Sequence, residues 1–198
     1  MPARSTRSPA AAPARHDRPL PAVEYHIRPA NPGAHLFEVS CTVAEPDPAG
    51  QVFSLPAWIP GSYMIREFAR NSVRIRAEAD GVPCALEKLD KHTWRAAAVR
   101  GARVLSVQYE VYAWDLSVRT AHLDTTHGFF NGTSVFLAVA GRSDASCVVS
   151  IERPEGEIGR DWKLVTALPP EHGRLGQACR FGRFRAADYD ELIDHPVE

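Results

Sequence analysis

The chain has 198 residues, of which 44% are hydrophobic, which is enough for one substantial core. Its formal net charge of -1 provides no field that would hold nucleic acid or an anionic membrane, so neither is expected as a partner. No stretch approaches the roughly 18 apolar residues of a membrane helix, and the expected location is cytoplasmic.

The first 21 residues differ in composition from the rest of the chain. Arg, Pro, Ala and Ser dominate residues 1–21, which lack the apolar stretch of a secretory signal. We therefore predict a disordered tail. A transit peptide is the alternative, although the prolines of this segment would interrupt the amphipathic helix that such a peptide forms. Residues 22–198 show no internal repeat or compositional break and are predicted to form one β domain.

Alternating apolar and polar residues predict strands with one buried face. Residues 37–43 and 73–79 each carry apolar side chains at every second position. Asp80-Gly81 follows the second run directly, and this pair favours the positive φ angles of a tight hairpin that returns the chain through residues 83–89. Further strands are predicted at residues 93–97, 104–112, 135–139, 147–151 and 180–185.

Two short helical turns are expected between and after the strands. Ser62 is predicted to cap a turn over residues 63–70, and Asp188 a turn over residues 189–193, where acidic residues suit the helix dipole. Loops rich in Gly and Pro separate the other elements. The predicted fold class is all-β: a twisted antiparallel β-sandwich of about 8 to 11 short strands with one or two short helical turns.

Residues 55–71, called the signature segment below, contain more Pro, Gly, Trp and Tyr than an ordinary core strand needs. Together with later segments in a fixed order, this segment resembles the amino-terminal domain of the M61 metallo-aminopeptidases, the glycyl-aminopeptidase-like enzymes. The resemblance covers residues 23–198. The later segments that carry it are residues 90–94, 111–119, 128–134 and 189–194.

The resemblance implies a parent enzyme of three parts. These are this β domain, a thermolysin-like helical domain that binds zinc, and a carboxyl-terminal domain of the PDZ type. Only the first is expected in this chain. The expected partner is therefore the catalytic domain of the same parent polypeptide, through which the peptide substrate would be met. No cofactor is expected in this chain, and zinc is expected in the catalytic domain.

The residues themselves agree that catalysis is not carried by this chain. A zinc aminopeptidase of this type needs the pattern His-Glu-x-x-His, and none of the eight histidines is followed by Glu. His122 and His127, with Asp124 between them, are the closest pair, but a single strand would place the two rings on opposite faces. No Gly-x-Ser-x-Gly elbow, catalytic cysteine pattern or phosphate loop is present. We predict no catalytic and no metal-binding residue.

Six residues are predicted to border the catalytic domain. Trp, Tyr and Arg contribute most when a partner buries a surface, which favours this role for the signature segment. The alternative is that Trp58 and Tyr63 anchor the segment on its own core, while Arg66 and Arg70 pair with acids. Residues 188–198 resemble the segment that leads into the catalytic domain in the M61 enzymes. The six candidates are Trp58, Tyr63, Arg66, Tyr189, Asp190 and Asp194.

A second loop is a candidate for contact with the amino end of a substrate. Two aromatic residues precede the polar turn Asn131-Gly132-Thr133, which is predicted either to reach toward the substrate or to form a simple β-bend. Replacing Asn131 by Ala in the complete enzyme is then expected to raise the Michaelis constant without unfolding it. The formal glycosylation pattern at Asn131 is interpreted as structural.

The four cysteines are far apart and form no Cys-x-x-Cys pair. We expect them to be small buried hydrophobic residues, with a disulfide as the alternative. They are Cys41, Cys84, Cys147 and Cys179.

Two functions of different classes follow. The first is a non-catalytic β domain of an M61-type zinc aminopeptidase, which alone does not hydrolyse peptides. The second is a free-standing β-sandwich that binds protein or carbohydrate through exposed aromatic loops. Leu192 and Ile193, flanked by acids, favour the first as a junction to a following domain. An exposed apolar patch would favour it as well.

Overall fold

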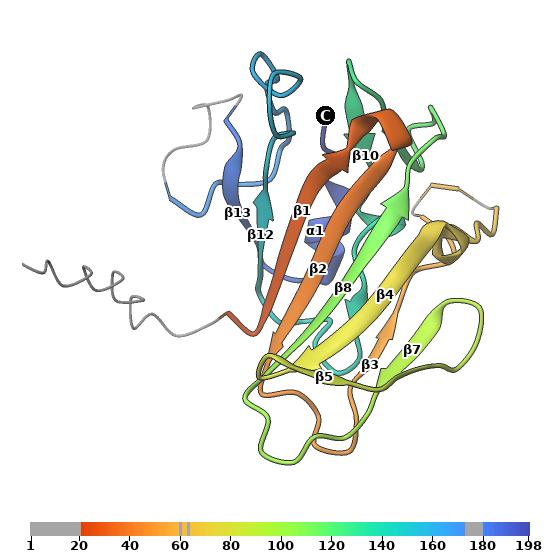
Figure 1. The fold of residues 1–198 in the computed structure, drawn as a ribbon, viewed down its shortest axis with the longest axis vertical. Coiled ribbons are helices and arrows are strands. Elements are labelled where there is room, and N and C mark those ends of the chain that lie inside the picture. Colours follow the sequence, from red (N-terminus) through yellow and green to blue (C-terminus); the bar gives the residue numbers. More distant parts are fainter. Residues whose placement is uncertain (1–20, 60, 63, 173–179) are drawn as a thin grey trace, which may run out of the picture.

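A computed structural model of the chain describes residues 21–59, 61–62, 64–172 and 180–198. Two open sheets pack around one apolar core, and a two-stranded hairpin lies at one end of the sandwich (Figure 1). The architecture confirms the all-β sandwich with few short helical turns. The predicted tail, residues 1–21, lies outside the described residues except for its last position.

The larger sheet has the strand order β13-β12-β1-β2-β8-β4-β5. Its strands pair antiparallel except for β1 and β12, which run parallel. Every second residue of β2 and β8 is buried, as the alternation of residues 37–43 and 104–112 predicted. The strands are β1 Val23–Asn31, β2 Leu36–Ala44, β4 Ser72–Ala79, β5 Val82–Cys84, β8 Val104–Tyr112, β12 Cys147–Ile151 and β13 Gly182–Ala186.

The smaller sheet has the order β11-β3-β7-β6, and β10 pairs with β9 in a separate hairpin. The predicted return of the chain over residues 83–89 is split, because the chain leaves the larger sheet after β5 and enters the smaller one at Leu86. These strands are β3 Val52–Ser54, β6 Leu86–Lys88, β7 Thr93–Ala96, β9 Ala121–Leu123, β10 Gly128–Phe130 and β11 Ala138–Val139.

The hairpin predicted at Asp80-Gly81 is confirmed. Asp80 has a φ of 48° and Gly81 a φ of 81°, the left-handed conformations that this turn requires. The Asp80 carboxylate also accepts hydrogen bonds from the amides of Arg103 and Val104, which ties the turn to the start of β8.

One of the two predicted helical turns is confirmed. Helix α1 (Tyr189–Asp194) begins after Asp188, whose Oδ1 accepts a hydrogen bond from the Glu191 amide at 2.7 Å. The turn predicted over residues 63–70 is right only at its end. The Arg66 amide donates to the Ala57 carbonyl and closes a loop, and a 3₁₀ helix forms at η2 (Phe68–Asn71). No helix among the described residues is long and apolar enough to cross a membrane.

The strand predicted over residues 135–139 is largely wrong: only β11 forms there. Three buried tyrosines account for this difference, because their hydroxyls donate to the carbonyls that a strand would pair. The bonds join Tyr109 to Val135 at 2.6 Å, Tyr189 to Phe136 at 2.8 Å and Tyr25 to Leu137 at 2.7 Å. The segment is thus a buried irregular one that follows the 3₁₀ helix η3 (Gly132–Ser134).

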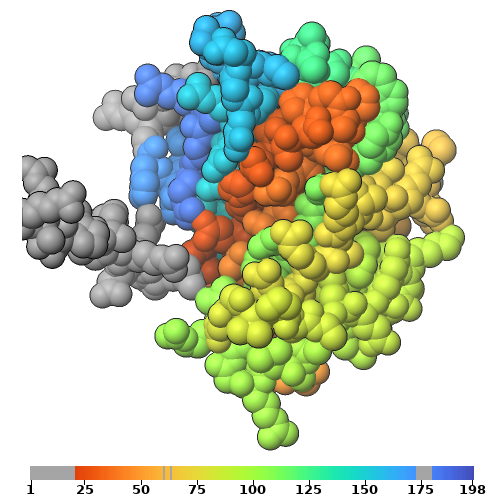
Figure 2. All heavy atoms as spheres, in the orientation of Figure 1, coloured from red at the N-terminus to blue at the C-terminus, as the bar shows by residue number. Residues whose placement is uncertain are grey.

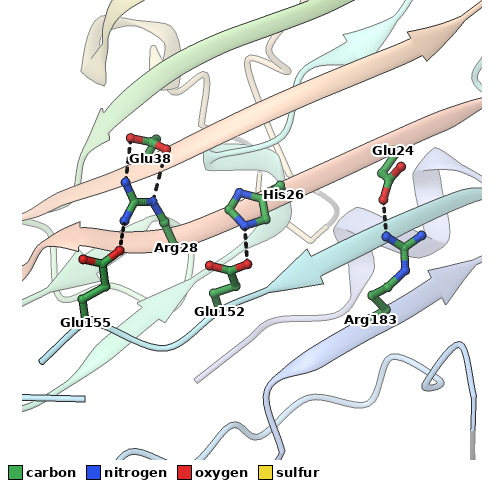
Figure 3. A network of polar contacts seen from close by, with 7 residues as sticks. All are labelled: Glu24, His26, Arg28, Glu38, Glu152, Glu155 and Arg183. Atoms are coloured by element: carbon green, nitrogen blue, oxygen red, sulfur yellow. Dashed lines mark hydrogen bonds and ion pairs between the residues drawn. The ribbon is translucent and has the colours of Figure 1, made fainter. Parts of the chain in front are cut away.

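The outer face of the larger sheet carries ion pairs between neighbouring strands and loops (Figure 3). Arg28 on β1 contacts Glu38 on β2 at 3.2 Å and Glu155 at 2.9 Å. On the same face, Arg183 on β13 pairs with Glu24 on β1. These charged groups are thus paired within the chain.

Two of the predicted buried cysteines are buried. Cys41 and Cys147 lie in the core as free thiols, and burial raises the pKa of both, that of Cys147 to about 12. Cys84 is also free but only half-buried, because it lies on the edge strand β5. Cys179 lies outside the described residues.

Candidate functional site

The signature segment is a loop fastened to the core at both ends. Leu55 and Ile59 near its start and Phe68 and Ala69 near its end are buried. Trp58, in contrast, is 57% exposed, so the alternative in which Trp58 anchors the segment is wrong. Ile59 is the anchor, because it is buried where its neighbour Trp58 is not.

The exposed part of the signature segment combines apolar side chains with a guanidinium whose Nε has no hydrogen-bond partner among the described residues. Met64 is 64% and Ile65 79% exposed. The Nε atom of Arg66 is buried and has no hydrogen-bond partner in the described structure. The alternative in which Arg66 pairs with an acid is not seen among the described residues, and the neighbouring acid, Glu67, instead contacts Lys91 at 2.6 Å. Tyr63, the other aromatic candidate here, lies outside the described residues.

A second loop, residues 112–120, faces the signature segment. Trp114 is 54% exposed and packs on the rings of His35 and His122, with centroids 3.9 and 5.0 Å away. Leu116 and Val118 at the tip of the loop are also exposed. The sequence predicted no site residue in this loop. Its large apolar residues at every second position, Trp114, Leu116 and Val118, were a signal that could have pointed to it.

Residues 64–71 and 112–120 line a groove of about 390 Å³, called the loop groove below. In Figure 2 the green residues of the second loop adjoin the golden residues of the first at one edge of the molecule. Thr120 lies buried at the base and its hydroxyl donates to the Asp115 carbonyl at 2.9 Å, which fixes the turn of the second loop. The groove therefore has firm walls and an apolar rim.

His122 and His127 come together in a way that the single-strand argument missed. They belong to the two sides of the β9–β10 hairpin, so their rings lie on one side with centroids 5.7 Å apart. Asp124 forms the turn: its carboxylate accepts from the Thr126 hydroxyl and amide, each at 2.7 Å. These bonds hold the pKa of Asp124 well below its usual range.

This histidine pair does not make a metal centre. His122 contacts the carboxylate of Asp124 at 3.2 Å, and His127 contacts that of Glu198 at 3.3 Å. The described residues contain no group of three or more His, Cys, Asp or Glu side chains placed to bind a metal ion.

The predicted substrate loop is closed. Asn131 Oδ1 accepts from the amide and hydroxyl of Thr133, at 3.1 and 2.5 Å, and Thr133 is fully buried. Gly132 lies under helix α1, where an added Cβ would come within 2.8 Å of the Ile193 Cα. The geometry matches the structural alternative, a capped bend, and contact with a substrate remains a prediction.

The last segment is divided between core and surface. Tyr189 is buried and donates to the Phe136 carbonyl, whereas Asp190 and Asp194 are exposed on α1. Leu192 is buried and Ile193 packs partly against the core. Their apolar character is thus explained within this domain, and the interpretation of these two residues as a junction loses its support.

Comparisons with known proteins agree on the relationship. The chain is similar to an aminopeptidase N family protein from Idiomarina loihiensis, with 39% identity and a TM-score of 0.81 over 88% of this chain. It spans only 28% of that protein. A mutant M1 zinc metallopeptidase from Deinococcus radiodurans shares the fold at 10% identity, with a TM-score of 0.51 over 88% of this chain and 40% of its own. No curated protein sequence matches.

The family assignment follows from nearly the whole domain. The signature segment, the second loop and helix α1 all fall inside one continuous match that runs from β1 to the last residue. The family model that matches residues 24–198 is that of the Peptidase M61 N-terminal domain, and the chain belongs to this family.

Proposed function

We propose that this chain is the non-catalytic amino-terminal β domain of an M61-type zinc metallo-aminopeptidase. The observation that carries the proposal is the similarity to an aminopeptidase N family protein of which this chain spans 28%. The rest of such a protein has room for a catalytic domain. The absence of His-Glu-x-x-His from the present sequence agrees with a division of labour between domains.

The role proposed for the domain is architectural. A rigid sandwich with a continuous core can hold one wall of a cleft while the reacting groups belong to a neighbour. The exposed apolar loops support a packed partner rather than a free-standing module, because a contiguous apolar patch marks a surface that something covers. Zinc and the peptide substrate would be bound by the catalytic domain.

The test begins with the native polypeptide. Its intact mass in the source cell, detected with an antibody against residues 25–198, is expected to exceed that of the 198-residue chain several-fold. The complete polypeptide is then assayed on a panel of aminoacyl p-nitroanilides, before and after zinc chelation. We expect hydrolysis that chelation abolishes and added zinc restores.

The isolated chain provides the control. It is expected to fold, as judged by circular dichroism, and to release no p-nitroaniline. A native mass equal to that of this chain, hydrolysis by the isolated chain, or a folded complete polypeptide without chelator-sensitive activity would each overturn the proposal.

A further inference from the structure

Exposed apolar side chains are concentrated around the loop groove. Of the thirteen large hydrophobic residues exposed in the described structure, seven belong to the signature segment or to residues 112–120. Scattered single exposures need no explanation, but a cluster of this kind marks a surface that is buried by a partner. Four of the seven line the groove itself, namely Met64, Ile65, Tyr112 and Trp114, and the other three, Trp58, Leu116 and Val118, belong to the same two segments.

The cation at the edge of this cluster lacks an acceptor among the described residues. Leaving a buried polar atom without a hydrogen bond is unfavourable, and the Arg66 Nε is such an atom. Arg66 and Arg70 line the groove together with Glu67 and Asp115, but Glu67 is already paired with Lys91. With Glu67 engaged by Lys91, two arginines face the single carboxylate of Asp115 in the groove, and the Arg66 guanidinium can take a further carboxylate, which arginine can bind in a bidentate way.

The walls of the groove are formed before any partner arrives. The imidazoles of His35 and His122 pack against Trp114, and the Thr120 hydroxyl donates to the carbonyls of Asp115 and Ser117. An ordered surface loses little conformational entropy on association, so a preorganised aromatic side chain is a favourable contact for a partner.

The carboxyl-terminal residues lie at the same end of the domain. Val197 pairs with Phe130 by two backbone hydrogen bonds of 3.0 Å, and the next residue, Asn131, donates to the carbonyl of Thr120 at the base of the groove. Figure 1 places the carboxyl end and the β9–β10 hairpin together. Chain that continues from Glu198 in a parent polypeptide would begin at this end of the domain, where Glu198 contacts His127 at 3.3 Å.

We propose that the loop groove is the docking surface for the catalytic domain of the same polypeptide, and that Arg66 receives a carboxylate of that domain. This inference rests on the proposed function and names the surface through which it operates. The apolar rim excludes water from the contact, and the ion pair between Arg66 and the carboxylate sets its register.

Hydrogen–deuterium exchange tests the surface directly. Amides of residues 64–71 and 112–120 are compared between the isolated chain and the complete polypeptide. We expect both segments to exchange at least about tenfold more slowly in the complete polypeptide. Amides of residues on the outer face of β1 and β2 serve as the internal reference and should exchange at equal rates in the isolated chain and in the complete polypeptide. Equal exchange of the groove segments in both proteins would overturn the inference.

Two matched pairs of variants in the complete polypeptide test the residues. Arg66→Met and Ile65→Ser should each abolish most of the added protection. Their controls are Arg185→Met on β13 and Val82→Ser on β5, which are exposed but lie away from the groove and should leave it unchanged. Loss of protection in the controls as well, or in neither Arg66→Met nor Ile65→Ser, would contradict the assignment.

The experiments distinguish failure of the docking surface from failure of the proposed function. Zinc-dependent activity with an unprotected groove rejects only the docking surface, whereas a protected groove without peptidase activity rejects only the proposed enzyme. Protection that rises with protein concentration would show that a second copy covers the groove, and this too would overturn the inference.

Discussion

The signature segment and the segment over residues 128–137 have similar compositions, but they differ in how far their side chains are buried and hydrogen-bonded within the chain. Both combine aromatic residues, a glycine and polar side chains. In the second, Asn131 and Thr133 bond to each other and tyrosine hydroxyls bind the following carbonyls. In the first, apolar side chains are exposed and the Arg66 Nε is unpaired among the described residues. The polar groups of the second segment are thus bonded within this domain, whereas the signature segment presents groups that a partner could contact.

The comparison shows that aromatic and polar content alone does not identify a contact surface. What separates the two segments is whether polar groups find partners within the chain. A loop whose polar groups are already bonded gains little from a new neighbour, because each bond to that neighbour must replace an existing one. A guanidinium whose Nε has no partner among the described residues, beside an apolar rim, gains from both kinds of contact.

The largest effect expected in the second segment tests whether it is packed under α1. Gly132→Ala would place a methyl group against the backbone of α1, at 2.8 Å from the Ile193 Cα. We expect this change to lower the free energy of unfolding by about 2–3 kcal/mol, because backbone cannot move aside as a side chain can. Urea denaturation of the isolated chain measures the loss.

Gly61→Ala in the signature segment is the matched control. Its added Cβ meets no described residue within 4 Å, and the positive φ of 78° opposes the change, at about 1 kcal/mol. Equal losses for the two variants would mean that the second segment is not packed under α1.

The next effect tests the tyrosine hydroxyls that hold residues 135–137. Tyr109→Phe removes the donor to the Val135 carbonyl and the acceptor for the Leu137 amide. Because these backbone groups are buried, we expect a loss of about 2 kcal/mol in the free energy of unfolding. Tyr112→Phe, on the same strand but 44% exposed, should change it by less than about 0.5 kcal/mol. Similar values for both would contradict the role of the hydroxyl.

Much of the larger sheet could be predicted because local sequence specifies it. One face of β2 and β8 is buried, so their residues alternate, and the Asp80-Gly81 turn depends only on its own φ angles. Residues 135–137 could not be assigned in this way. Their three carbonyls accept from tyrosines that belong to three separate elements, β1, β8 and α1, and no local pattern records such contacts.

The candidate site was predicted in part. The signature segment does form one wall of the groove, but its composition does not say that Ile59 is buried and Trp58 exposed. The second wall was missed because residues 112–120 carry no chemical motif. The turn at Asp124 was a usable signal for the β9–β10 hairpin, since aspartate followed by two threonines favours a local hydrogen-bonded turn.

A smaller effect concerns Asp124, in the β9–β10 hairpin between the loop groove and residues 128–137. Its pKa is held below the usual range, so the ionised carboxylate stabilises the fold above the ordinary value of about 4. This contribution is lost as the pH falls from there toward the lowered pKa. Asp124→Asn should therefore cost about 1 kcal/mol of unfolding free energy at neutral pH and progressively less at about pH 3.

Asp161→Asn, at an exposed position outside the hairpin, is the control for the substitution itself. Urea denaturation at both pH values gives the difference from the parent chain. A cost at Asp124 that grows as the pH falls would have the opposite sign to the one expected and would contradict the hydrogen-bonded turn.

The smallest expected effect distinguishes the signature segment most clearly from residues 128–137. Ile65 is 79% exposed, so Ile65→Ser removes almost no buried surface from the isolated chain and should change its free energy of unfolding by less than about 0.5 kcal/mol. Phe68→Ala, three residues later but buried, should cost about 3 kcal/mol or more in the same measurement. If Ile65→Ser were as costly as Phe68→Ala, Ile65 would be a core residue, and the signature segment would be as closed as the one that ends under α1.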